Sequence, residues 1–298
     1  MLLQVLGTAA GGGVPQWNCA CPGCAGARAH PHRRRRHASL AVRADRAGWF
    51  LVNATPDIGD QIESSPALLP GPGPRESPLA GIVLTDAELD HTLGIARLRE
   101  ADGIHIIATP PVRHALLGRL HLGEVLAPYT RVDWRELGRE GGPLLQGGTV
   151  EVAAVPVSAK RPRYAAGSGP DDPTWVVALR LRDTATGRSL LYAPALASWT
   201  DELQEAAEQA DCVLVDGTFW DEDEPVRHGL SGATATGMGH LPVTGRHGTA
   251  RRLAGLRGRC LYTHLNNTNP LTDPDAPQHA QLAEWGLEVA AEGMVIEL

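Results

Sequence analysis

The stretch VLTDAELDHTLG, from Val83 to Gly94, joins an apolar run to a cluster of side chains that can bind metal. A familiar way to seat two zinc ions at the end of a strand is the pattern H-x-H-x-D-H. This chain keeps Asp90 and His91 but has Asp86 and Glu88 in place of the first two histidines. The stretch therefore predicts a site that has lost one metal position and kept the other.

The residues around this stretch place its polar side chains at a strand end. Gly81 to Leu84 is apolar and predicts a buried strand, and Thr92 to Glu100 predicts a helix. The polar residues between them lie in a turn where side chains from several strands can converge. Asp86 and Glu88 are then further candidate ligands. From spacing alone, an acidic turn that caps the next helix is the alternative.

A second candidate histidine, His264, lies in CLYTHLNNTNP, again just after an apolar run. If the two strand ends meet, Asp90, His91 and His264 supply one carboxylate and two imidazoles. Such a set with open coordination positions suits mononuclear Fe(II) and oxygen chemistry, whereas a closed tetrahedral set favours structural zinc. A histidine satisfied within the core is the alternative for His264.

Two further strand ends carry polar groups. Asp216 follows the apolar run in VLVDGTFW, and His240 lies in the turn GMGHLPVTG. Each could bind metal, orient a metal-binding histidine, or only form a turn. We interpret both as catalytic-site residues that orient a ligand.

The cysteines fall into two kinds. Cys212 and Cys260 lie in apolar runs and are expected in the core. Cys19, Cys21 and Cys24 are clustered in WNCACPGC and can wrap one structural zinc ion, with free thiols as the alternative. A fourth ligand must come from elsewhere, and the candidates are His30, His32, His37 and Asn267.

Composition excludes some function classes. The chain of 298 residues has a net charge of -7, which gives no broad basic field for nucleic acid. The run Arg33 to Arg36 is expected to be a solvated turn, with anion binding as the alternative. No apolar run approaches the roughly 18 residues that span a membrane, and the N-terminus lacks the basic start of a signal peptide. We expect a cytoplasmic protein with one domain over 1-298.

Short strands alternate with helical patterns along the chain, which predicts a layered α/β sandwich. The other helices are expected at 112-120, 201-209 and 278-285. The other strands are expected at 2-6, 40-42, 49-53, 105-108, 149-155, 176-181, 190-192, 212-215, 260-263 and 294-298.

Several long motifs resemble one family. They are GTAAGGGVPQWNCACPGCAGARA, NATPDI, LTDAELDHTLGI, LVDGTFW, MGHLPVTG, THLNNTNP and EVAAEGMVIEL. They are similar to the pyrroloquinoline quinone (PQQ) biosynthesis protein B family of the metallo-β-lactamase fold, from the first strand to the C-terminus. The resemblance implies an αββα sandwich, a structural zinc at the three clustered cysteines, and an active site around Asp90, His91 and His264.

The activity that the resemblance implies is an iron- and oxygen-dependent hydroxylation of the tyrosine ring in a peptide-derived glutamate-tyrosine unit. The expected partners are that small substrate and O2, and a homodimer is left open. The family usually carries a histidine-rich segment where this chain has Lys160 to Trp175, which contains no histidine. A related peptide-derived substrate is therefore an alternative. A zinc-dependent phosphodiesterase or lactonase and a quinone carrier are the alternative functions.

Overall fold

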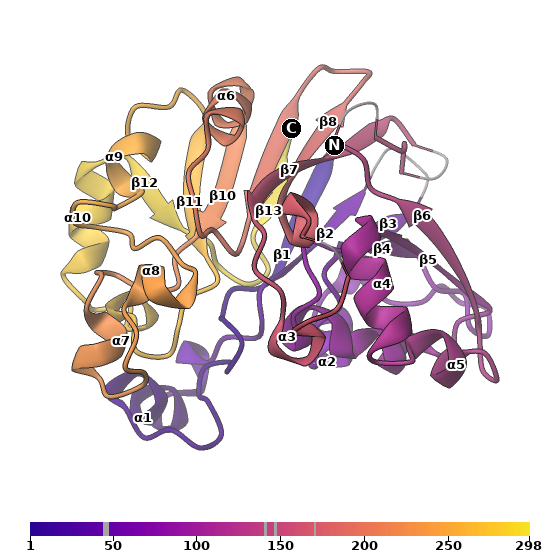
Figure 1. Ribbon diagram of the computed structural model, residues 1–298, viewed down its shortest axis with the longest axis horizontal. Coiled ribbons are helices and arrows are strands. Elements are labelled where there is room, and N and C mark those ends of the chain that lie inside the picture. The colour runs from indigo at the N-terminus through magenta and orange to yellow at the C-terminus, as the bar shows by residue number, and fades with distance from the viewer. Residues whose placement is uncertain (44–47, 140–141, 146–147, 170) are drawn as a thin grey trace.

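A computed structural model describes residues 1–43, 48–139, 142–145, 148–169 and 171–298 (Figure 1). Its strands form two sheets in the described chain. The first has the order β13-β1-β2-β3-β4-β5-β6 and the second the order β12-β11-β10-β9-β8-β7. Sheet one comprises β1 (Leu2–Gly7), β2 (Ser39–Arg43), β3 (Trp49–Val52), β4 (Leu79–Val83), β5 (Gly103–Ala108), β6 (Arg131–Glu136) and β13 (Val295–Glu297). Sheet two comprises β7 (Val150–Ser158), β8 (Val176–Asp183), β9 (Ser189–Ala193), β10 (Cys212–Asp216), β11 (Arg259–Thr263) and β12 (Leu287–Val289).

Helices cover the outer faces of both sheets, as Figure 1 shows. The α-helices are α1 (Pro22–Ala29), α2 (Ile58–Glu63), α3 (Leu89–Thr92), α4 (Pro110–Gly118), α5 (Leu122–Leu126), α6 (Asp201–Gln209), α7 (Glu224–Arg227), α8 (Ala235–Met238), α9 (Ala250–Leu253) and α10 (Gln278–Glu284). Short 3-10 turns are η1 (Pro31–Arg33), η2 (Pro66–Leu68), η3 (Leu93–Leu98), η4 (Arg163–Ala165), η5 (Pro173–Trp175) and η6 (Pro270–Thr272). Among the residues that the structure describes, no helix is both long and apolar enough to cross a membrane.

Three apolar layers hold the sheets and helices together. The central layer joins the inner faces of both sheets and contains Phe50 and Tyr192. A second layer packs α6, α9 and α10 on sheet two, and a third packs α2, α4 and α5 on sheet one. Each large apolar side chain buried in such a layer contributes about 1.5–3 kcal/mol to stability. The layer order is therefore α/β/β/α, which confirms the predicted sandwich.

The predicted helix from Thr92 to Glu100 is wrong. A short helix α3 ends at Thr92 and a 3-10 segment follows. The backbone groups that would continue an α-helix bond to Ala54 instead. Ala54 N donates to His91 O at 2.8 Å, and Gly94 N donates to Ala54 O at 2.9 Å. Gly94 also packs tightly against the backbone of Ala54 and Thr55, because a Cβ on residue 94 would lie only 2.0 Å from Thr55 O. Tertiary hydrogen bonds thus override the helical pattern.

Two strands and most of the short helices were not predicted. The strand β6 has the polar sequence RVDWRE at the edge of sheet one, and β12 is only three residues long. Neither has the apolar run on which strand prediction depends. The helix α1 begins inside the cysteine cluster, with Pro22 at its first position, where proline is favourable because the missing N–H has no helical partner.

The arginine run from Arg33 to Arg36 is not the solvated turn that we predicted. Arg33 pairs with Asp273 at 2.9 Å and Asp275 at 2.8 Å. Arg35 donates to Thr8 Oγ1, and Arg36 pairs with Glu292 at 3.1 Å. The run therefore attaches the segment after α1 to distant parts of the chain.

Candidate metal centre

Both sheets contribute strand ends to one site. The segment with Asp86, Asp90 and His91 follows β4 of sheet one. The strands β10 and β11 of sheet two are parallel neighbours, so Asp216 at the end of β10 lies opposite Thr263, and His264 follows directly. The carboxyl ends of these strands thus meet, which is the condition under which Asp90, His91 and His264 can share one site.

Asp90, His91 and His264 bring their ligand atoms together. Asp90 Oδ2 lies 3.7 Å from His91 Nε2 and 3.6 Å from His264 Nε2. Both Nε2 atoms are buried and have no hydrogen-bond partner among the described residues. Because buried polar atoms are normally paired, two unpaired nitrogens beside a carboxylate fit a bound metal ion. These residues would hold that ion.

Hydrogen bonds on the far side of each ring aim the two nitrogens. His91 Nδ1 contacts Asp86 Oδ2 at 2.7 Å, and His264 Nδ1 contacts Thr218 Oγ1 at 2.8 Å. Thr218 in turn donates to Asp216 Oδ1 at 2.6 Å. Such outer partners fix the ring orientation and the tautomer that leaves Nε2 free to bind metal.

Sequence reasoning missed Thr218. The only local signal is its place two residues after Asp216, where the Asp216 carboxylate accepts from the Thr218 backbone N–H at 2.8 Å in an Asx-type turn. That signal predicts a turn and not a contact with a histidine 46 residues away.

Asp216 and His240 form a pair beside this set. His240 Nδ1 contacts Asp216 Oδ2 at 2.6 Å, and the backbone N–H of Leu196 donates to the same oxygen at 2.8 Å. Atoms of Asp216, His240 and His264 also lie within 4.8 Å of one another. Thr218 bridges them, since its Oγ1 contacts Nδ1 of His240 as well. Hydrogen bonds therefore account for this second cluster, which agrees with a role in orienting ligands.

Asp86 and Glu88 do not converge with the other ligand atoms. Across the described ranges, no triad of His, Cys, Asp and Glu ligand atoms within 4.8 Å of one another includes either. Asp86 is fully buried and its oxygens accept from His91, Thr85 and the Glu88 backbone. Glu88 is half-buried and lines the cavity beside Asp90. Asp86 therefore orients the His91 ring through Nδ1, as Thr218 orients the His264 ring.

The carboxylates control the charge of the site. Burial by itself would lower the pKa of His91, but the negative charges of Asp86 and Asp90 raise that pKa to about 9. Burial would likewise raise the pKa of Asp90, yet His91 and His264 hold it well below its usual range. Without metal, His91 is therefore protonated near neutral pH, and a metal ion must displace that proton on binding.

The backbone approaches the site closely at two points. His264 has a φ of 58°, in the left-handed region that costs energy for a residue with a Cβ and is often found at functional sites. In the glycine turn after β1, a Cβ on Gly11 would lie 3.2 Å from Asp90 Oδ2.

A cavity of about 300 Å³ opens above these groups. Its apolar lining includes Val176, Ala195 and Phe219. The ring of Phe219 meets that of His240 edge-on, with centroids 6.0 Å apart. The cavity thus combines a polar floor with apolar walls that can hold a small aromatic ligand.

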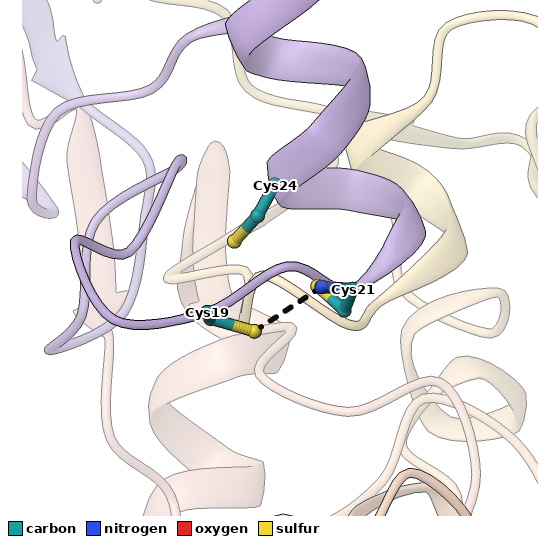
Figure 2. A group of neighbouring side chains, drawn as sticks. All are labelled: Cys19, Cys21 and Cys24. Carbon is teal, nitrogen blue, oxygen red and sulfur yellow. Dashed lines mark hydrogen bonds between the residues drawn. The ribbon is translucent and has the colours of Figure 1, made fainter.

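The clustered cysteines form a separate site at the start of α1. Figure 2 shows the thiols of Cys19, Cys21 and Cys24 turned toward one another, with the backbone N–H of Cys21 donating to Cys19 Sγ at 3.4 Å. Their sulfur atoms lie within 4.8 Å of one another. Burial raises the pKa of Cys21 to about 11, so a metal ion must displace its proton. This clustering fits one zinc ion.

Asn267 is the candidate fourth ligand that reaches the cysteines. Its Nδ2 lies 3.1 Å from Cys19 Sγ, 3.4 Å from Cys21 Sγ and 3.3 Å from Cys24 Sγ. Amide oxygen and nitrogen are assigned by their hydrogen bonds, so a turn of the amide would present Oδ1 to a metal ion. His37 instead pairs with Asp57 at 3.0 Å, and the rings of His30 and His32 contact each other.

Comparison with known proteins agrees with the fold. Residues 48–265 match the model of the β-lactamase superfamily domain. The crystal structure of Zn²⁺-bound PqqB from Methylobacterium extorquens has a TM-score of 0.88 and 33% identity, with both chains fully covered. A diphosphatase of the PhnP family, at 18% identity and a TM-score of 0.69 over 100% of this chain and 97% of its own, shares the fold.

Fold and site thus define a metal-binding protein of the β-lactamase superfamily. Coenzyme PQQ synthesis protein B of Azoarcus sp. (strain BH72) is 42% identical over the full length of both chains. The same protein of Cupriavidus necator is 40% identical over 99% of each. The chain belongs to the coenzyme PQQ synthesis protein B family, which confirms the resemblance seen in its motifs.

Replacing Thr218 by valine should weaken metal binding at the Asp90 site about 10- to 100-fold, because His264 Nδ1 loses its partner. Metal titration of the purified variant measures this. Thr263→Val is the matched control, since its buried hydroxyl has no hydrogen-bond partner in the described structure and should not affect metal affinity. Equal metal affinity of the Thr218 variant and the wild type would exclude this role.

Proposed function

We propose that this chain is an Fe(II)- and O2-dependent hydroxylase of the tyrosine ring in a peptide-derived glutamate-tyrosine unit during PQQ biosynthesis. The observation that carries the proposal is the convergence of Asp90 Oδ2 with two buried, unpaired imidazole nitrogens. Two imidazoles and one carboxylate are a ligand set typical of non-haem Fe(II) oxygenases. Iron bound there would supply the one-electron chemistry by which O2 reacts with a phenol.

The remaining residues support this chemistry by position. Asp86 and Thr218 fix the two histidine rings, so the three ligand atoms stay on one side of the site. Val176 and Phe219 line the cavity with apolar surface, against which a phenol ring can pack. The buried floor excludes water from the part of the cavity next to the ligands, since His91 and His264 are almost fully buried.

The contacts of Asp86 and Asp216 disfavour a zinc hydrolase with two metals. Hydrolases of this kind use a pair of ions to clamp both oxygens in a displacement. In this chain Asp86 and Asp216, two carboxylates near the site, are already hydrogen-bonded to His91 and His240. Carrying a quinone does not require unpaired metal-ligand atoms in the floor of the cavity, so these atoms also disfavour a quinone carrier.

Mass spectrometry under labelled O2 tests the proposal. Protein loaded with Fe(II) under anaerobic conditions is mixed with a glutamate-tyrosine peptide and ascorbate, which supplies the two electrons that reduce the second oxygen atom to water. The expected product gains one labelled oxygen on the ring. The same reaction in labelled water under unlabelled O2 should give no label.

Two results would contradict the proposal. One is the absence of label in every tyrosine-containing substrate. The other is zinc-dependent cleavage of a phosphodiester or lactone that is lost in His264→Ala. Metal analysis of anaerobically purified protein accompanies the assay and shows which metal the wild type carries.

A further inference from the structure

Lys160 is the only lysine in the sequence, and it lies at the mouth of the cavity above the metal ligands. It follows β7 in the connection to β8. Its Nζ donates to the backbone carbonyl of Met238, which also lines the cavity. Gly239 makes room for the lysine, because a Cβ at this position would lie 3.0 Å from Nζ. The side chain is thus directed across the mouth by a defined contact.

The cavity lining contains both negative and positive side chains. Asp86, Glu88 and Asp90 line it near the metal ligands, and Lys160 is the one Lys or Arg among its described lining residues. Burial, Asp86 and Asp90 raise the pKa of Glu88, whereas the charge of Lys160 acts in the opposite direction. Lys160 is exposed, so it offers an anionic group a fixed positive charge at the mouth of the cavity.

The ammonium group of Lys160 has capacity for a ligand. It carries three N–H donors, and the Met238 carbonyl accepts one. The ion pairs found within 4.0 Å in the described chain leave Lys160 without a carboxylate partner, in contrast to neighbouring Arg161, which pairs with Asp171 at 2.7 Å. Two donors are free to bind a carboxylate with charge-assisted hydrogen bonds.

We propose that Lys160 determines substrate specificity by binding a carboxylate of the substrate at the cavity mouth, which directs the aromatic ring toward Asp90, His91 and His264. The inference rests on the proposed function, because it assumes an aromatic substrate with an anionic end. It assigns the recognition of that end to the segment between β7 and β8, which has no histidine in this chain. Lys160 acts in binding and is not a metal ligand.

Binding to zinc-loaded protein tests this role without any redox reaction. Calorimetric titration with glutamyl-tyrosine is compared with titration by its diamide, in which both carboxylates are amidated. Lys160→Gln should bind the dipeptide roughly 10- to 100-fold more weakly than the wild type, the range expected for one charge-assisted hydrogen bond. Lys160→Arg should stay within a few fold of the wild type. The diamide should bind the wild type and Lys160→Gln equally.

Arg163→Gln is the matched control. Arg163 is exposed, lies three positions away and does not line the cavity, so its removal changes the net charge equally. The affinity of the Arg163→Gln variant for the dipeptide should equal that of the wild type. A melting curve of each variant checks that the fold is retained.

The outcomes separate this inference from the proposed function. Loss of dipeptide affinity in Lys160→Gln but not in Arg163→Gln supports the role of Lys160 even if no hydroxylation is found. Equal affinity of Lys160→Gln and the wild type overturns it even if hydroxylation occurs. The inference is also wrong if the wild type binds the diamide as tightly as the dipeptide, or binds neither.

Discussion

Replacing His264 by alanine is expected to remove the catalytic metal and to lower activity by more than about 100-fold. The variant loses one of the three ligand atoms that converge at the site, since His264 Nε2 lies 3.6 Å from Asp90 Oδ2. Loss of an outer partner costs only about 10- to 100-fold, which is the effect expected for His240→Ala. Metal analysis should show that the variant keeps the zinc of the cysteine site and lacks the second ion.

A second variant at position 264 separates loss of the ligand from backbone strain. Its φ of 58° is strained for any residue with a Cβ, so alanine keeps that strain without the compensating metal bond. His264→Gly removes the ligand and tolerates this backbone. If both variants keep the fold and lose the metal, the loss is due to the ligand. His228→Ala, an exposed histidine outside the cavity, should retain both ions. Full metal content and turnover in the His264 variants would contradict the assignment.

Replacing Cys21 by serine should remove one equivalent of zinc and lower the melting temperature by about 10 °C. The free energy of zinc binding contributes to folding when the ligands form the site only in the folded chain. A loss of about 3–5 kcal/mol is typical of a lost structural metal and corresponds to a shift of this size in a protein this large. Zinc analysis and calorimetry measure the two effects.

Cys260→Ser is the control for the cysteine site. Cys260 is a buried thiol on β11 that donates to the backbone carbonyls of Leu253 and Gly258, and a serine hydroxyl can make the same contacts. This variant should keep its zinc and lose at most about 1 kcal/mol of stability. If Cys21→Ser keeps the zinc content and the melting temperature of the wild type, the cluster is not a structural zinc site.

Local sequence was enough to predict most strands and the site residues that follow them. The strand β10 and the helix α6 are recognisable because their apolar residues recur with the period of their own element. Asp90 and His91 stand next to each other after an apolar strand, so their place at a strand end is a local property. The polar edge strand β6 lacks this signal, and its place depends on pairing with β5.

The role of each polar residue depends on neighbours that are distant in the chain. The sequence favoured Asp90 and left Asp86 as a further candidate ligand, but only the folded chain shows that Asp86 faces His91 Nδ1 while Asp90 faces two unpaired Nε2 atoms. In the same way, the sequence did not distinguish among four candidates for the fourth zinc ligand. In the folded chain Asn267 Nδ2 lies 3.1 Å from Cys19 Sγ.

By itself, the sequence determined the class of fold, the two groups of candidate metal ligands and the family, because periodicity and motif spacing are local properties of the chain. The tertiary structure decided which groups share a site, and it revealed Thr218 and placed Lys160 at the cavity mouth. The physical reason is that hydrogen bonds and metal sites require atoms a few ångströms apart. Residues from β4, β10 and β11 reach such distances only when the two sheets pack together.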